Sequence, residues 1–128
     1  MNAFEKAIQN ALEAKGNNQE ANKAYLEFLK ANFIIPIEKN TESDPHVLYF
    51  VENGISYLPL FSSMTYLDSW AASIKDEISL LKLTGVDLLK GLGESTYISL
   101  NLGSDLYKEF NSSELARMRN MVLKLFKT

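Results

Sequence analysis

The sequence of 128 residues contains no cysteine and only one histidine, His46. Without thiols the chain has no disulfides, no thiolate nucleophile and no cysteine ligands for zinc or iron–sulfur clusters. A metal site needs three or four ligands, and Asp44-Pro45-His46 offers two, so we expect no bound metal. The longest apolar run, Phe33 to Ile37, is too short to span a bilayer, and the first residues lack a signal-peptide pattern. We therefore expect a cytoplasmic protein without membrane insertion.

Familiar catalytic motifs are also missing. No serine lies in a G-x-S-x-G elbow, and no G-K-[ST] phosphate loop occurs. Gly91-Leu92-Gly93 begins like a dinucleotide fingerprint, but Thr96 stands where the third glycine belongs. The adjacent carboxylates Asp76 and Glu77 are expected on opposite faces of an extended segment, unlike a catalytic pair. We therefore expect no cofactor and favour a protein that is not an enzyme.

Charge is unevenly distributed along the chain, whose net charge is −3. Residues 38–77 contain seven acidic residues and two lysines, whereas residues 112–128 contain four basic residues and one acid. Binding to phosphate backbones needs a basic surface, so the acidic middle argues against nucleic acid. The basic last segment is compatible with an acidic partner or anionic lipid, although an amphipathic helix more often packs against a sheet.

The remaining patterns predict one mixed α/β domain over residues 1–128. The hydrophobic share of 46% and the charged share of 23% are those of an ordinary globular domain. Apolar residues at helical spacing in Asn2 to Lys15, followed by Gly16 and a second such segment, predict an N-terminal αα-hairpin. Ser63 is expected to cap a short helix, and a C-terminal helix is expected after residue 111. Three capping boxes mark helix starts at Asn17–Glu20, Thr84–Asp87 and Asn111–Glu114.

Short apolar runs between turn signals predict a mixed sheet of about five strands. The expected strands are Phe33 to Ile37, Val47 to Val51, Ile55 to Phe61, the buried Glu77 to Leu83, and Tyr97 to Leu100, with a possible short extension at Tyr107 to Phe110. Asn53-Gly54 favours a type I′ turn and hence a β-hairpin. Pro36 and Pro59 indicate strand edges, ends or bulges because proline cannot donate to a ladder. Strand–helix–strand connections favour parallel neighbouring strands, whereas a hairpin is antiparallel. A mixed sheet with helices packed against it accounts for both.

Three motifs, in this order, carry a family resemblance. They are Leu58-Pro59-Leu60-Phe61-Ser62-Ser63 with Trp70 downstream, Gly85-Val86-Asp87-Leu88-Leu89, and Ser99-Leu100-Asn101-Leu102-Gly103-Ser104. Over roughly Asn2 to Phe126 the chain resembles the N-terminal domain of the SseB family. This resemblance implies a bacterial, cytoplasmic domain without accepted catalytic residues, here expected to stand alone without the family's C-terminal domain. Leu102 replaces the proline that is usual in this turn.

The candidate binding residues lie at the ends of two expected strands. They are Phe61, Ser62, Ser63, Trp70, Asn101, Gly103 and Ser104. If these strands are parallel neighbours, both ends meet at one sheet edge, where open α/β sheets bind ligands. The alternative is purely structural: the aromatic rings fill the core, a serine caps its helix, and the residues after the second strand form a turn.

These patterns together favour a non-enzymatic interaction or regulatory domain. It would bind a protein partner or a small ligand, as a monomer or weak homodimer, without nucleic acid. The alternative is a small-molecule-binding or hydrolytic enzyme with an unusual site near Ser104. A deep pocket holding Asn101, Ser104 and converging titratable groups would favour the enzyme.

Overall fold

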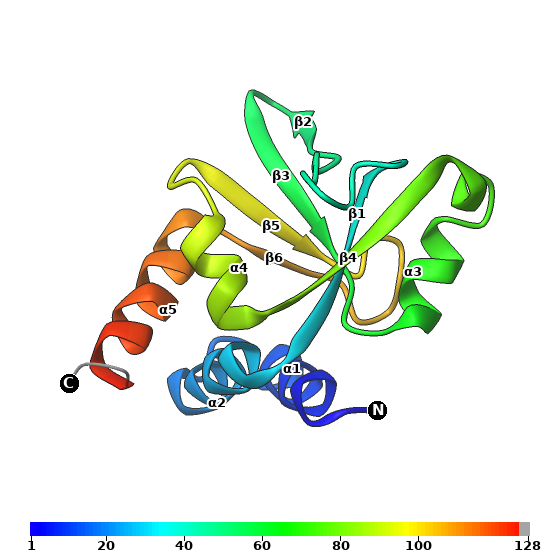
Figure 1. The fold of residues 1–128 in the computed structure, drawn as a ribbon. Helices are drawn as coiled ribbons and strands as arrows, with labels where there is room; N and C mark the ends of the chain where they lie inside the picture. The colour runs from blue at the N-terminus through cyan, green and yellow to red at the C-terminus, as the bar shows by residue number, and fades with distance from the viewer. Residues whose placement is uncertain (126–128) are drawn as a thin grey trace.

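The computed structural model describes residues 1–125, in which five α-helices pack against six strands (Figure 1). The helices are α1 (Ala3–Glu13), α2 (Asn18–Lys30), α3 (Met64–Trp70), α4 (Gly85–Gly91) and α5 (Ser112–Leu125), with a 3₁₀ turn η1 (Lys75–Glu77). The strands are β1 (Asn32–Glu38), β2 (Phe50–Glu52), β3 (Ile55–Leu60), β4 (Ile78–Thr84), β5 (Thr96–Leu100) and β6 (Lys108–Phe110). This confirms the mixed α/β class. Phe126, the last residue of the resemblance, lies outside the described residues.

The predicted helix starts are confirmed by their caps. The backbone N–H of Glu20 donates to Asn17 Oδ1 at 3.1 Å, and that of Asp87 donates to Thr84 Oγ1 at 3.1 Å. At the start of α5 the box is reciprocal. Glu114 N–H donates to Asn111 Oδ1 at 3.0 Å, and Asn111 N–H donates to Glu114 Oε1 at 3.3 Å. These bonds satisfy backbone donors that the first turn of a helix leaves free.

The predicted hairpin is also confirmed. Asn53 and Gly54 have φ angles of 53° and 79°, as a type I′ turn requires at its two central residues. The turn joins β2 to β3 in antiparallel register. The strand β2 begins at Phe50, later than expected, because Val47 instead forms an isolated bridge with Ile37 of β1.

The strands form two sheets, which differs from the single sheet expected. One sheet contains β1 and β4, and the other has the order β2-β3-β5-β6, with β3 and β5 parallel. The division arises because β4 does not join the larger sheet by a parallel crossover but returns antiparallel along β1. It is half-buried rather than fully buried, since it lies at the edge of a two-stranded sheet. An isolated bridge between Ile34 and Phe61 joins the two sheets.

Both prolines lie where a strand lacks a regular partner on one side. Pro36 is in β1, whose regular partner β4 lies on one side only, and its carbonyl accepts from Leu48 N–H at 3.3 Å. Pro59 is in β3, which lies between β2 and β5. The pairing of β3 with β2 ends at Tyr57, so at Pro59 only β5 is a regular partner. The missing N–H of each proline therefore costs no ladder bond.

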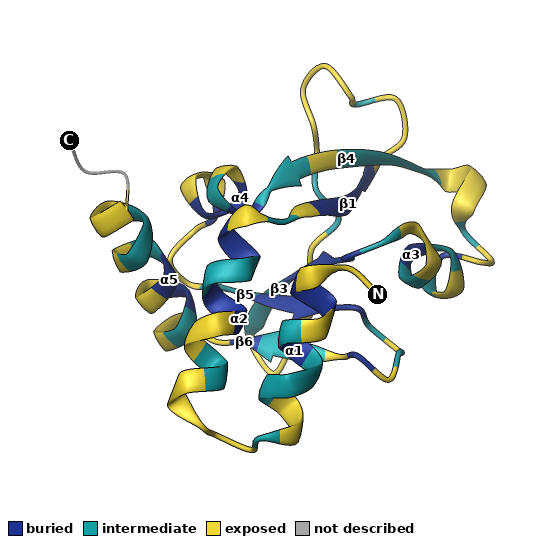
Figure 2. Cartoon of the chain, turned by 90° about the horizontal axis from the view of Figure 1, so that it is seen from below, coloured by how far each residue is buried: buried dark blue, intermediate teal, exposed yellow. Residues whose placement is uncertain are grey.

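The main core lies between the helices α1, α2, α4 and α5 and the strands of the four-stranded sheet together with β1. Its centre is a group of contacting rings formed by Phe4, Phe28, Phe33 and Phe110. Figure 2 shows buried residues where the helices face the strands and exposed residues at the α1–α2 turn. A second, smaller cluster joins α3 to the bridge between the sheets and contains Ile34, Phe61 and Leu67.

Candidate functional site

The parallel pairing of β3 and β5 brings the two predicted strand ends together at one edge of the sheet. Ser62 N–H donates to Asn101 Oδ1 at 3.0 Å, and Asn101 Nδ2 donates to Ser62 Oγ at 2.9 Å. Both residues are buried, and Asn101 has the positive φ of 53° that asparagine tolerates. The predicted proximity of the two motifs is therefore found in the structure.

A carboxylate from the first helix completes this cluster. Glu5 is 4% exposed, and its Oε2 accepts from Ser62 Oγ at 2.6 Å. Its Oε1 accepts from Asn2 N–H at 2.9 Å, in a capping box that starts α1. The start of α1 thus packs over the strand ends, and the buried carboxylate receives hydrogen bonds from both sides, as burial of a charge requires.

The other predicted residues surround this cluster. Phe61 is fully buried, and its ring centroid lies 5.2 Å from that of the partly buried Trp70 in the smaller core cluster. Ser63 is the residue before α3, but its side chain makes no capping hydrogen bond, which corrects the expected cap. Gly103 is exposed in the turn with φ of 78°. Ser104 Oγ donates to the Asn101 carbonyl at 2.8 Å and accepts from Leu106 N–H at 3.1 Å.

The polar groups of these strand ends are therefore largely occupied by one another. Ser104 has its hydroxyl engaged with the backbone of its own turn. The single histidine, His46, is exposed and lies near Glu38 Oε2 at 3.2 Å, in a different part of the chain. A binding role for this turn stays a prediction, whereas a hydrolytic site at Ser104 has no base beside it among the hydrogen bonds of residues 1–125.

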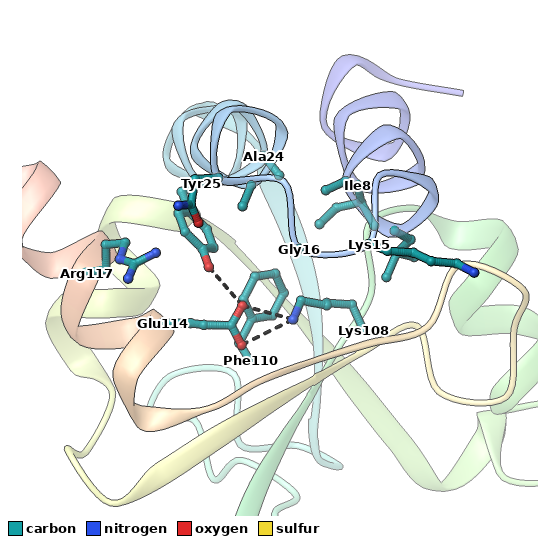
Figure 3. Close-up of a pocket in the computed structure, with 13 residues that line it drawn as sticks. Ile8, Lys15, Gly16, Ala24, Tyr25, Lys108, Phe110, Glu114 and Arg117 are labelled. Atoms are coloured by element: carbon teal, nitrogen blue, oxygen red, sulfur yellow. Dashed lines mark hydrogen bonds and ion pairs between the residues drawn. The ribbon is translucent and has the colours of Figure 1, made fainter.

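A cavity of about 340 Å³ opens elsewhere, between the α1–α2 turn, β6 and the first turns of α5 (Figure 3). Its apolar wall is formed by side chains of α1, α2 and β6. These are Ile8, Ala11, Leu12, Ala21, Ala24 and Phe110. The amphipathic stripes that pair α1 with α2 thus also leave part of their apolar surface facing the cavity.

The polar wall is centred on Glu114. Tyr25 Oη donates to Glu114 Oε2 at 2.9 Å, and Lys108 Nζ forms an ion pair with the same carboxylate at 2.9 Å. Burial, followed by the hydrogen bond to Glu114, raises the pKa of Tyr25 to about 12. The phenol is therefore neutral near neutral pH and acts as a hydrogen-bond donor rather than as a base.

Two cations face this carboxylate. Figure 3 shows Lys108 and Arg117 on opposite sides of Glu114, with Lys15 at the rim and its ammonium directed away. The Arg117 guanidinium lies 5.9 Å from the centroid of the Tyr25 ring, within cation–π range. Arg117 forms no ion pair within residues 1–125, so this wall has a surplus of positive charge.

The polar groups of this wall are held by contacts with one another. Glu114 accepts from Tyr25, Lys108 and the backbone of Asn111, so its oxygens are not free to take a proton from a substrate. Lys108 Nζ is held by that same carboxylate at 2.9 Å. The cationic side chains of Lys108 and Arg117 therefore offer hydrogen-bond donors at one end of an otherwise apolar cavity.

Sequence reasoning did not single out this cavity. Tyr25 belongs to the apolar stripe of the second predicted helix, and Glu114 belongs to a predicted helix cap; the structure confirms both. The two residues are 89 positions apart, and their contact depends on how α2 and α5 pack. The one available signal was the concentration of basic residues in the last segment, which includes Arg117.

Two further observations bear on the predicted absences. Among residues 1–125, no three His, Asp or Glu side chains are grouped closely enough to hold a metal ion. A metal-free protein stays a prediction, which metal analysis of the purified protein would check. In the same range, no helix has the length and apolar character needed to cross a membrane.

Comparison with known proteins gives one match. The model of the SseB protein N-terminal domain matches residues 5–117, which includes both strand ends and the cavity walls. No curated protein and no solved structure matches the chain. Because the match spans most of the sequence, the chain belongs to the SseB N-terminal domain family.

Proposed function

We propose that this domain is a non-enzymatic binding module and that the cavity beside Glu114 is its ligand site. The observation that supports this most is the division of the cavity into an apolar wall and a polar wall. Ligand sites generally combine apolar lining with a few convergent polar groups in this way. Tyr25 and Lys108 are both bonded to Glu114, whereas Arg117 forms no ion pair among the described residues, which suits recognition of an anion.

The cavity suits a small, largely apolar molecule with a carboxylate at one end. Its volume of about 340 Å³ is that of a small-molecule site. Lys108 and Arg117 outnumber the single carboxylate of Glu114, on a protein whose net charge is −3. The positive surplus is therefore local, and a carboxylate would gain charge-assisted hydrogen bonds there. The apolar body would lie against Ile8 and Phe110.

A cytoplasmic location is part of this proposal, since a chain without cysteine is compatible with a reducing compartment. We also propose that the domain is a monomer or a weak homodimer. The rival proposal, a hydrolytic enzyme at Ser104, has less support because the hydroxyl bonds to its own turn.

Titration with octanoate, followed by amide NMR shifts of the full chain, tests the proposal. Octanoate should shift amides around Ala24, Phe110 and Arg117, and octylamine at the same concentration should shift them much less. If octylamine binds as well as octanoate, the assigned charge preference is wrong. If neither binds, or the shifts centre on another surface, the cavity is not the ligand site.

A matched pair of variants adds a second test. Ala21→Leu places a larger side chain into the cavity and should weaken octanoate binding, whereas Ala116→Leu, at an exposed position of α5 away from the cavity, should not. Arg117→Gln should also weaken octanoate binding while leaving thermal stability nearly unchanged, because Arg117 is exposed. Equal binding by Ala21→Leu and the unmodified protein would contradict this location.

A further inference from the structure

The outer face of the four-stranded sheet carries a row of three aromatic rings. The register places Phe50 opposite Tyr57, and Tyr57 opposite Tyr97, so the three side chains stand side by side on neighbouring strands. The Phe50 and Tyr57 rings are stacked, with centroids 5.1 Å apart, and Tyr97 meets Tyr57 edge-on at 5.7 Å.

This row faces away from the main core. Alternate residues of a strand point to opposite faces, and Leu58 and Ile98, the next residues after Tyr57 and Tyr97, belong to the core beneath the helices. None of the three rings belongs to either core cluster, and all three are partly exposed. The rings thus contact one another on a surface that the described helices do not cover.

Two carboxylates border the rings. Glu52 is exposed and shares this face with Phe50, two residues away on β2. Glu109 of β6 accepts a hydrogen bond from Tyr57 Oη at 3.1 Å. Burial raises the pKa of Tyr57, and the hydrogen bond to Glu109 and the charges of Glu109 and Glu52 raise it further. With Ile55, these residues (Phe50, Glu52, Ile55, Tyr57, Tyr97 and Glu109) are called the aromatic face, and they include no basic side chain.

The neighbouring edge of the sheet is open. The strand β2 is the outermost strand of its sheet, and apart from the hairpin ladder no other described strand pairs with it. On the opposite face of this edge, the apolar side chains of Val51 and Tyr49 are 71% and 50% exposed. An open edge offers backbone donors and acceptors to an extended peptide, whose alternate side chains then lie on the same face as the rings.

We propose that the aromatic face and the free edge of β2 bind an extended segment of a partner protein with arginine or lysine at alternate positions. The segment adds to β2 as a further strand, and its basic side chains lie over the rings and near Glu52. Aromatic rings attract cations over their faces, and flanking carboxylates add ion pairs. This site is separate from the cavity beside Glu114, and neither proposal depends on the other.

Fluorescence anisotropy with two labelled peptides of the same composition tests this proposal. The probe is Arg-Val-Arg-Val-Arg-Val, and the comparison is Arg-Arg-Arg-Val-Val-Val. The alternating peptide should bind more tightly, and its affinity should fall as salt is added, because exposed ion pairs are screened. Equal binding of both peptides would overturn strand addition, and no binding of either at low salt would overturn the site.

Variants locate the binding surface. Glu52→Gln should lower the affinity of the alternating peptide about threefold, since one exposed ion pair at the end of β2 is lost. Phe50→Leu, on β2 itself, should lower it about threefold through loss of a cation–π contact. The control Glu77→Gln removes an equally exposed carboxylate in η1 and should leave the affinity unchanged. An equal loss of peptide affinity in the control would overturn the proposal. So would a protein dimer that dissociates in these variants while no peptide binds, because the face would then be a contact between two copies of the chain.

Discussion

Ser62 and Asn101, 39 residues apart in sequence, hydrogen-bond to each other in both directions at the ends of parallel strands. The asparagine amide accepts from the Ser62 backbone and donates to its hydroxyl, and that hydroxyl donates to Glu5. These bonds join β3, β5 and α1 at one buried point. A small polar network thus replaces apolar packing where three elements of the fold converge.

We predict that Asn101→Ala lowers the free energy of unfolding by about 3 kcal/mol, because buried partners lose their hydrogen bonds. Part of this loss comes from the backbone, since Asn101 has a φ of 53°. Asn101→Gly removes the same side chain but adopts positive φ freely, so it should be about 1 kcal/mol more stable than the alanine variant. Urea unfolding of both variants measures the difference, and a fully stable Asn101→Ala would contradict the role of the network.

The helix α4 contains two glycines with opposite expected behaviour. A Cβ at Gly85 would collide with the backbone carbonyl of Phe28, whereas a Cβ at Gly91 would meet nothing within 4 Å. Gly85→Ala should therefore destabilise the protein by about 2–3 kcal/mol, because α2 and α4 must move apart. Gly91→Ala, the matched control in the same helix, should be neutral or stabilising by about 0.5 kcal/mol. Similar melting temperatures for the two variants would show that α4 does not approach α2 this closely.

The hairpin turn gives a third prediction. Gly54 has a φ of 79°, in the region that a β-branched residue resists, so Gly54→Val should lower stability by about 1–2 kcal/mol. Gly54→Asn should cost much less, because asparagine adopts this conformation more readily. Thermal melts of both variants check the prediction. If the valine variant melts at the unmodified temperature, the turn is not of this type.

The raised pKa of Tyr25 predicts loss of stability in alkali. The phenol has an ordinary value of 10.0 in the unfolded chain and about 12 in the folded protein. Below pH 10 Tyr25 is protonated in both the folded and the unfolded chain, so its contribution to the free energy of unfolding is fully present. Between pH 10 and 12 Tyr25 ionises in the unfolded chain first, so stability falls. Tyr25→Phe should reduce this alkaline loss. Unfolding measured across this range compares the two proteins, and identical slopes would contradict the raised pKa.

Local patterns in the sequence were enough to predict most of the elements. The helix caps at Asn17, Thr84 and Asn111 are correct, although only the box at Asn111 has both of its hydrogen bonds, because capping involves residues only three positions apart. The Asn53-Gly54 turn is correct for the same reason, since its geometry depends on the φ preferences of two adjacent residues. The motifs also predicted the family, and the parallel strand ends came together at one edge.

Only the tertiary structure decided how these elements combine. The strand β4 has an apolar pattern compatible with several partners, and pairing with β1 rather than with the larger sheet depends on contacts along its full length. The cavity beside Glu114 has the same origin, because Tyr25, Lys108 and Glu114 come from three elements that meet only after α2 and α5 pack against the sheet. The sequence by itself determined the elements and their ends through short-range bonds and φ preferences. Pairing between strands and the shape of the binding surfaces depended on long-range packing, which no local pattern encodes.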